Sequence, residues 1–393
     1  GSGPYVVESI EMGKSITLKR NNKYWGNGLP LNRGRYNFGR IKMIFYSSPA
    51  ESFRAFLDKE VDFRDESIFE NWAIMDHLKL NADGLKLEKI EHSRNEGMRA
   101  YAFNIRLDFQ WINEHFYQRQ YRRATSFFNN STLASRGKPV GRELDVLKND
   151  RDLLPPEVFE NQYMPPGTID IDSLMELYNA REMPVDYRNE LARRYDNDTN
   201  LDTALNILLK NGYHYSDEGE LVDDTKAPLS VKVLIPFQSG LEAPTMTFIR
   251  NLTRLGILAE MEIADIDDFR ERLRTFNYEM TVYRWNQSES PGYEQREFWG
   301  SSAATRPGSQ NIIGIKDQVI DKLVDNVISS TTREKLIDNT HALDRVLLWN
   351  YYVVPLWYVP CDRIAYWDKF SRPQGQPAYR YDLFSWWVVE SEK

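Results

Sequence analysis

The stretch 229–285 reads LSVKVLIPFQSGLEAPTMTFIRNLTRLGILAEMEIADIDDFRERLRTFNYEMTVYRW, and its pattern decides the fold class. Runs rich in β-branched and aromatic residues alternate with amphipathic segments, which is the signature of strands alternating with helices. The predicted elements are strand 229–235, helix 243–255, strand 258–263, helix 266–275 and strand 278–285. This βαβαβ order predicts an α/β fold, in which helices pack against a sheet.

The loop after the last of these strands is the first candidate site. Ligands of α/β sheets bind beyond the strand ends, and this strand ends at the aromatic residue Trp285. The next four residues offer amide, hydroxyl and carboxylate groups that suit a polar ligand: Asn286, Gln287, Ser288 and Glu289. An ordinary polar turn would account for the same residues, so both interpretations stay open at this point.

The flanking sequence extends the α/β pattern in both directions. Predicted strands are 16–20, 41–46, 62–64, 98–105 and the apolar run 353–360, whose prolines favour a sheet edge. Predicted helices are 49–58, 202–210, 317–328 and 332–349. With 393 residues the chain exceeds the usual size of a single core, so two lobes are expected. The first would combine 1–100 with about 350–393, and the second would span 101–349.

Composition and motifs exclude several functions. The formal charge of −8 comes without a polybasic run, which argues against a nucleic-acid partner. A single cysteine, Cys361, excludes an internal disulfide and favours an inert, buried thiol. Five scattered histidines provide no metal motif, so neither a metal nor a cofactor is expected. No apolar stretch approaches the roughly 18 residues of a membrane span, and no secretion signal opens the chain, which predicts a soluble protein.

Enzyme motifs are also missing from the sequence. It contains no nucleophile elbow, no phosphate-binding P-loop and no dinucleotide-binding glycine pattern. A glycosidase needs only two carboxylates, for which Glu289 and Glu294 are conceivable, so this alternative stays open. The chain is otherwise expected not to be an enzyme.

Several segments together resemble one family, the extracellular solute-binding proteins of family 5, which serve ABC importers. The resemblance begins with Ser2-Gly3-Pro4-Tyr5 and continues through 18–25 and Asp62-Phe63. It is densest to the branch that contains the binding protein of the microcin C and oligopeptide importer. The segments that match this branch are 32–38, 126–131, 155–159, 290–300, 306–309, 314–317, 342–349 and 363–368.

The resemblance implies a class C periplasmic-binding-protein architecture, with two lobes that close around a ligand cleft. It implies a periplasmic protein that captures oligopeptides or peptide-like solutes and delivers them to the permease subunits of an ABC importer. Contact with the membrane would be peripheral and only through that transporter. A solute-sensing or interaction domain on the same fold is the alternative.

The resemblance also assigns site residues. In the family, an aspartate in the loop after a tryptophan-ended strand commonly receives the peptide amine, and this chain lacks it. Either Glu289 replaces it, or Gln287 and Ser288 bind a ligand whose amine is blocked or bound elsewhere. For three aromatic residues two interpretations stay open, stacking on or covering the ligand and plain packing in a core. With an asparagine near the end of the predicted strand 98–105 they complete the set: Trp285, Trp357, Tyr358 and Asn104.

Three departures from the family pattern qualify the resemblance. Relatives carry a long segment before the Ser2-Gly3-Pro4-Tyr5 step, so the N-terminal part of the fold is expected to be missing here. A helix that follows the equivalent of Asn104 in relatives is expected to be deleted. The stretch 175–194 is expected to be longer than its counterpart.

Overall fold

The computed structural model describes residues 2–79, 84–102, 122–160, 197–375 and 379–389. Contacts divide the chain into two compact units. Unit 1 comprises Gly1–Arg94 and Pro360–Lys393, and unit 2 comprises Asn95–Val359. These boundaries differ from the sequence-based ones near 100 and 350, because strands β6 (Met98–Tyr101) and β13 (Val354–Pro355) pair within the sheet of unit 2.

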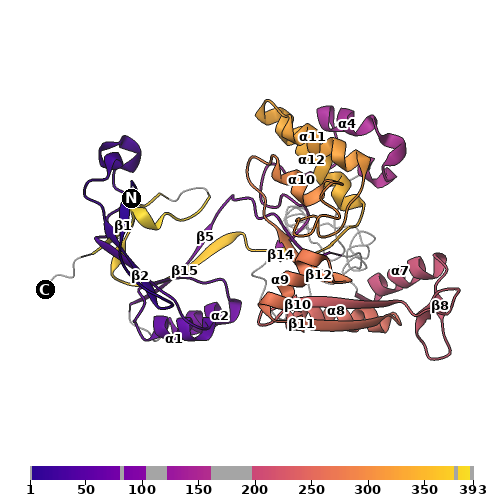
Figure 1. Ribbon diagram of the computed structural model, residues 1–393, viewed down its shortest axis with the longest axis horizontal. Coiled ribbons are helices and arrows are strands. Elements are labelled where there is room, and N and C mark those ends of the chain that lie inside the picture. The colour runs from indigo at the N-terminus through magenta and orange to yellow at the C-terminus, as the bar shows by residue number, and fades with distance from the viewer. Residues whose placement is uncertain (1, 80–83, 103–121, 161–196, 376–378, 390–393) are drawn as a thin grey trace, which may run out of the picture. The chain divides into compact units, whose positions relative to one another are not determined.

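The sheet of unit 2 contains the predicted βαβαβ motif (Figure 1). Its five strands lie in the order β11-β10-β12-β6-β13, and β10 pairs in parallel with both β11 and β12. The motif consists of β10 (Ser230–Pro236), α8 (Glu242–Arg254), β11 (Leu258–Ala264), α9 (Ile266–Thr275) and β12 (Met280–Trp285). The prediction of strand and helix order in this region is therefore confirmed.

Helix α8 is tied to the sheet through strand β6. The ring of Tyr101 on β6 stacks on Phe248 of α8 at a centroid distance of 5.3 Å. The Tyr101 and Thr245 hydroxyl oxygens are 2.5 Å apart within the same buried layer. Burial raises the pKa of Tyr101 far above its ordinary value, so the phenol stays protonated.

The apolar run 353–360 forms two short strands instead of the single predicted strand. Strand β13 lies at the edge of the five-stranded sheet, where the prolines were expected to confine it. After Leu356, whose N–H donates to the carbonyl of Arg99, β14 (Trp357–Tyr358) pairs with β7 (Arg122–Arg123) instead. The change of partner between the two strands is the reason that one strand becomes two.

A second group of helices in unit 2 packs around a large apolar core that includes Phe127, Trp285 and Trp299. The core continues through the apolar faces of the predicted helices near the C-terminal end of unit 2. The group comprises α4 (Gly141–Lys148), α10 (Glu294–Trp299), α11 (Gln318–Ile328) and α12 (Arg333–Trp349). The remaining elements among the described residues of unit 2 are η3 (Arg151–Leu153), η4 (Pro156–Phe159), α7 (Asn197–Lys210), β8 (His214–Tyr215) and β9 (Leu221–Val222).

Unit 1 is assembled from both ends of the chain. Strand β15 (Cys361–Trp367) lies between β4 (Phe63–Asp65) and β5 (Leu85–Glu91), antiparallel to both. A separate antiparallel sheet has the order β1-β2-β3. The other elements are β1 (Tyr5–Glu11), β2 (Ser15–Arg20), η1 (Trp25–Gly28), η2 (Pro30–Asn32), β3 (Arg40–Ile44), α1 (Pro49–Leu57), α2 (Phe69–Leu78), β16 (Phe370–Ser371), η5 (Leu383–Ser385) and β17 (Trp387–Val388).

Strand β15 supplies side chains to two small cores because alternate residues of a strand face opposite sides of the sheet. Ala365 and Trp367 face one core, in which Trp367 stacks on Phe56 of α1 at 5.6 Å. Ile364 and Tyr366 face the other core, which contains Trp386. The sequence did not predict β5 or β15, although it assigned the C-terminal segment to the first lobe.

Some expectations fall outside the described residues. They concern Asn104, the end of the predicted strand 98–105, the helix expected to be deleted after it, and the stretch 175–194. Within the part of the chain that the structure describes, no helix is both long and apolar enough to cross a bilayer.

Candidate functional site

Three chain segments meet at one end of the unit 2 sheet. Antiparallel pairing places Trp285, the last residue of β12, opposite Met98 on β6. On the other side of β6, the register of β13 brings the following residues, including Trp357, toward the same end. This end carries the carboxyl termini of the parallel strands, the position where ligands of α/β sheets bind. It therefore contains the candidate loop, which the sequence predicts at 286–294 and whose first part we call loop 286–290.

Asn95 fixes the shape of this loop through two hydrogen bonds, and a third orients its own side chain. Its backbone N–H donates to Glu289 Oε1 at 2.7 Å, and its Nδ2 donates to the carbonyl of Ser288 at 3.2 Å. Its Oδ1 accepts from the N–H of Gly97 at 3.0 Å. Asn95 is only 7% exposed, so these bonds are shielded from water and strengthened accordingly.

The carboxylate of Glu289 is thus partly engaged within the protein. One carboxylate oxygen of Glu289 accepts from the backbone N–H of Asn95. The backbone carbonyl of Glu289 accepts from the guanidinium of Arg333, which also donates to Thr132 Oγ1 at 3.2 Å. Glu289 is half-buried. No partner is recorded among the described residues for the second oxygen, Oε2, so this oxygen can accept one further donor.

The side-chain amide of Gln287 has a hydrogen-bond partner for its oxygen but none among the described residues for its nitrogen. The side chain is 8% exposed, and its Oε1 accepts from Gln295 Nε2 at 2.7 Å. Gln295 Oε1 in turn accepts from the indole N–H of Trp299 at 2.9 Å. The Nε2 of Gln287 is buried and donates to no acceptor among the described residues. An unpaired buried donor is costly, so this group is suited to bind an acceptor atom.

The predicted aromatic residues lie in different environments. Trp285 is fully buried, donates to the carbonyl of Gln310 at 3.3 Å and contacts Phe127 and Trp299 with its ring. Trp285 is therefore a core residue at the base of the loop, and its ring presents no face on which a ligand could stack. Trp357 is 3% exposed, whereas Tyr358 is half-buried. Asn286 and Ser288 are exposed.

Gly97 allows the connecting segment to approach the loop closely. Its φ is +61°, and a Cβ at this position would lie 2.0 Å from the carbonyl oxygen of Trp285. Only glycine tolerates both conditions. The carbonyl of Gly97 accepts from Asn129 Nδ2 at 2.8 Å, and the carbonyl of Asn129 accepts from the N–H of Glu96 at 3.0 Å.

A buried aspartate on α12 anchors the segment that carries Asn129. The carboxylate of Asp344 accepts four hydrogen bonds, from the Ser126 hydroxyl, the Phe127 N–H, and the N–H and hydroxyl of Ser135, at 2.7–2.9 Å. Burial raises the pKa of Asp344, while these donors act in the opposite direction. The next residue, Arg345, forms a buried ion pair with Glu143 at 2.8 Å.

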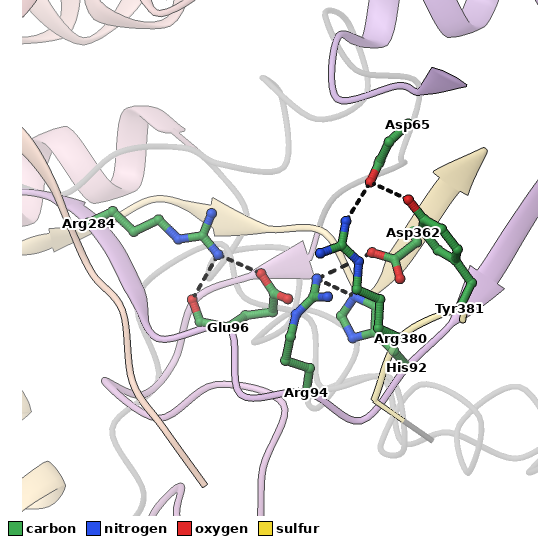
Figure 2. Close-up of polar contacts among 8 residues, drawn as sticks. All are labelled: Asp65, His92, Arg94, Glu96, Arg284, Asp362, Arg380 and Tyr381. Atoms are coloured by element: carbon green, nitrogen blue, oxygen red, sulfur yellow. Dashed lines mark hydrogen bonds and ion pairs between the residues drawn. The ribbon is translucent and has the colours of Figure 1, made fainter. Parts of the chain in front are cut away.

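Figure 2 draws polar contacts of unit 1 and of unit 2. Within unit 2, Arg284 Nη2 pairs with Glu96 at 2.7 Å. Within unit 1, Arg94 Nη2 lies 3.1 Å from His92 Nε2 and 3.4 Å from Asp362 Oδ1. The sequence analysis did not single out any of these residues, and isolated charges beside predicted strands give no signal that would have found them.

A second unit 1 cluster joins the C-terminal segment to strand β4 (Figure 2). The carboxylate of Asp65 accepts from Arg380 Nη2 at 2.9 Å and from the Tyr381 hydroxyl at 3.0 Å. Burial raises the pKa of Tyr381 to about 12, so the phenol remains a donor at neutral pH.

The chemistry of these clusters is that of hydrogen bonding. Within the described ranges, no three His, Cys, Asp or Glu side chains are grouped so that they could hold a metal ion. Cys361 is partly buried at the start of β15, and burial raises the pKa of its thiol, which keeps it protonated and unreactive.

Comparison with known families gives a direct match. The family described as bacterial extracellular solute-binding proteins, family 5 Middle, matches residues 1–306. Among curated proteins, the chain is 33% identical to the probable peptide-binding protein YejA of Agrobacterium fabrum, over 98% of this chain and 62% of that protein. The chain thus spans about three fifths of the length of the relatives that it matches.

Solved structures share the fold at low sequence identity. The oligopeptide-binding protein AppA of Bacillus subtilis, solved with a nonapeptide, has a TM-score of 0.65 and 13% identity, covering 99% of this chain and 66% of AppA. NikA of Brucella suis, solved with Fe(III)-EDTA, has a TM-score of 0.63 and 14% identity, covering 98% and 67%. The expected two-lobe α/β architecture of periplasmic binding proteins is confirmed. With the family match over most of its length, the chain belongs to the bacterial extracellular solute-binding proteins of family 5.

Proposed function

We propose that this chain is the substrate-binding component of an ABC importer, and that it captures oligopeptides or peptide-like solutes in the periplasm for delivery to the permease. The observation that carries the proposal is the loop 286–290, which the protein holds rigidly at the ligand-binding end of the sheet while leaving polar atoms unpaired. The relatives YejA of Agrobacterium fabrum and AppA of Bacillus subtilis are named as peptide-binding proteins, which supports a role without catalysis.

Two groups in the loop suit the polar backbone of a peptide. The Gln287 Nε2 donor can bind a peptide carbonyl, and the Glu289 Oε2 acceptor can bind an ammonium or amide N–H. Exposed Asn286 and Ser288 extend the same polar surface, and half-buried Tyr358 can cover an apolar side chain. Contacts to backbone atoms allow many peptide sequences to bind.

The first test asks whether the chain carries a peptide. Native mass spectrometry of the purified protein, followed by denaturing extraction, should recover peptides that are uncleaved after prolonged incubation. Stabilisation against heat by a mixed peptide library should accompany them. An empty protein that no peptide stabilises would contradict the proposal, and cleavage of a bound solute would indicate an enzyme instead.

The second test addresses Glu289. If its free oxygen receives the peptide amine, Glu289→Gln should weaken binding of a free-amine peptide about tenfold, because a charge-assisted hydrogen bond is lost. The same peptide with an acetylated amine should bind both proteins equally in calorimetry. Glu297→Gln is the matched control, since Glu297 is also a half-buried glutamate and pairs with Arg306 from helix α10. Wild-type preference for the acetylated peptide would instead support Gln287 and Ser288 as the contacts of a blocked ligand.

A further inference from the structure

One segment of unit 1 has a charge opposite to that of the whole protein. Between Glu11 and Glu51 the chain has no acidic residue and contains eight Lys and Arg residues, although the formal charge of the chain is −8. Three of these cations have acidic partners: Lys19 and Arg40 pair with Glu8, and Arg35 pairs with Asp382. No ion pair is recorded among the described residues for the others, which are Lys14, Arg20, Lys23, Arg33 and Lys42.

Three of the unpaired cations surround the connection between β2 and β3, which we call the basic tip (residues 20–35). The tip projects from the end of the β1-β2-β3 sheet (Figure 1). It is built from the two short helices η1 and η2. Asn21 accepts from the N–H of Lys23 at 3.1 Å, and Asn32 Nδ2 donates to the carbonyl of Gly26 at 2.9 Å. These bonds give the tip a defined shape.

The basic tip displays apolar side chains to solvent. Trp25 is 71% exposed, Leu31 is 80% exposed and Leu29 is 42% exposed. The neighbouring Tyr24 and Tyr36 contact each other edge to face at 5.9 Å, so aromatic packing is available within the tip. Trp25 contacts Tyr24 at only one edge and keeps most of its surface outside. Large apolar groups displayed together in this way mark an interaction surface.

We propose that the basic tip docks on an anionic phospholipid bilayer. Trp25, Leu29 and Leu31 insert at the level of the headgroups, and Arg20, Lys23 and Arg33 pair with lipid phosphates. Tryptophan favours the membrane interface because its ring is apolar while its N–H seeks water. Arginine and lysine beside an anionic surface each add binding energy that salt weakens.

The combination of groups favours a bilayer over other partners. An acidic protein would be matched by cations alone, whereas this surface adds an exposed tryptophan and two exposed leucines. A segment that combines exposed apolar side chains with cations is typical of a surface that lies on a membrane. The proposal does not depend on which solute the protein binds.

The test is co-sedimentation with vesicles. Binding is expected to vesicles of equal parts phosphatidylglycerol and phosphatidylcholine, not to phosphatidylcholine alone, and to fall as salt is raised. Lys23→Ala with Arg33→Ala should lower the partition coefficient roughly 30-fold, from about fivefold per cation. The matched control removes two exposed cations of unit 2, Lys148→Ala with Arg270→Ala, and should leave binding unchanged.

A second variant tests insertion separately from charge. Trp25→Ser with Leu31→Ser should lower the partition coefficient at least about tenfold while keeping the salt dependence. Both tip variants should keep the thermal unfolding midpoint of the wild type, since the replaced side chains are exposed. Absence of binding to both vesicle types would overturn the proposal and leave an acidic protein as the partner. Equal losses in the tip and control variants, or retained binding by the serine variant, would overturn it as well.

Discussion

The two units of this protein bury their apolar side chains in different ways. Unit 2 has one large core, in which Phe127, Trp285 and Trp299 contact one another. Unit 1 has two small cores on opposite faces of the sheet that contains β15. Unit 2 is one continuous stretch of chain, and its core joins residues from Met98 to Val353 within that stretch. Unit 1 needs both chain ends to meet before its sheet can form.

The difference extends to buried polar groups. In unit 2, hydrogen bonds lead from Asp344 through Ser126 and Asn129 to Gly97, and from there through Asn95 to the candidate loop. Unit 1 has a long-range buried bond of its own, from the Trp367 indole N–H to the carbonyl of Phe56 at 3.1 Å, while its buried Glu66 carboxylate pairs with Arg64, which is close in sequence. Long-range buried polar bonds fix a single arrangement of segments. We infer that unit 2 is the rigid carrier of the loop and that unit 1 is the less stable unit.

The largest expected effect is that of Asp344→Ala in unit 2. The substitution leaves buried donors of Ser126, Phe127 and Ser135 without an acceptor, which should cost about 4 kcal/mol of unfolding free energy. Urea denaturation should show the loss in the more stable of two transitions. Asp338→Ala, at a half-buried position on the same helix, is the control and should change little. A loss confined to the less stable transition would reverse the assignment of the two units.

Phe56→Ala should have the next largest effect, and in unit 1 alone. Phe56 is fully buried and stacks on Trp367 of β15, so truncation leaves a cavity that costs about 3 kcal/mol. Hydrogen exchange should become faster in β4, β5 and β15 and remain unchanged in β10 to β12. Uniformly faster exchange in both units would show that the protein unfolds as one cooperative body.

Gly97→Ala should have a smaller effect on stability and a local effect on the site. A left-handed backbone with a side chain costs roughly 1–2 kcal/mol, and the added Cβ would collide with the Trp285 carbonyl. Loop 286–290 must therefore shift, which should weaken peptide binding more than it lowers the unfolding midpoint. Gly314→Ala has a similar positive φ but open space around the Cβ, so it controls for strain alone. Equal losses of peptide binding in both variants would show that backbone strain alone is responsible, and would contradict the claim that Gly97 positions the loop.

In unit 1 the predicted strands 16–20, 41–46 and 62–64 and the predicted helix 49–58 are confirmed, but the sequence predicted the sheet topology of unit 2 better than that of unit 1, for a physical reason. From 229 to 285 the spacing of apolar residues alternates between that of strands and that of helices, and each element packs against its neighbours in sequence. The order of the elements can therefore be predicted from the local sequence. Strand β15 packs between β4 and β5 from the opposite end of the chain, a relation that no local pattern encodes.

The candidate site was predicted in part for a similar reason. Its loop follows directly from the strand-end rule, as residues 286–289 illustrate. Asn95, Asn129 and Asp344 were missed because they act through hydrogen bonds between segments distant in sequence. The burial of Trp285 was equally invisible, since an aromatic residue at a strand end can face either a core or a ligand.

The smallest expected effect is that of Glu8→Gln in the β1-β2-β3 sheet. Glu8 pairs with Arg40 at 2.6 Å and lies 3.8 Å from Lys19, but both cations are well exposed. Water and salt screen such pairs, and ordering the long side chains offsets what attraction remains. The unfolding midpoint of unit 1 should therefore not change measurably in calorimetry, at low or high salt. A clear drop of this midpoint at low salt only would mean that surface ion pairs stabilise unit 1 more than its two small cores do. The difference between the two units would then be one of electrostatics and not of apolar burial.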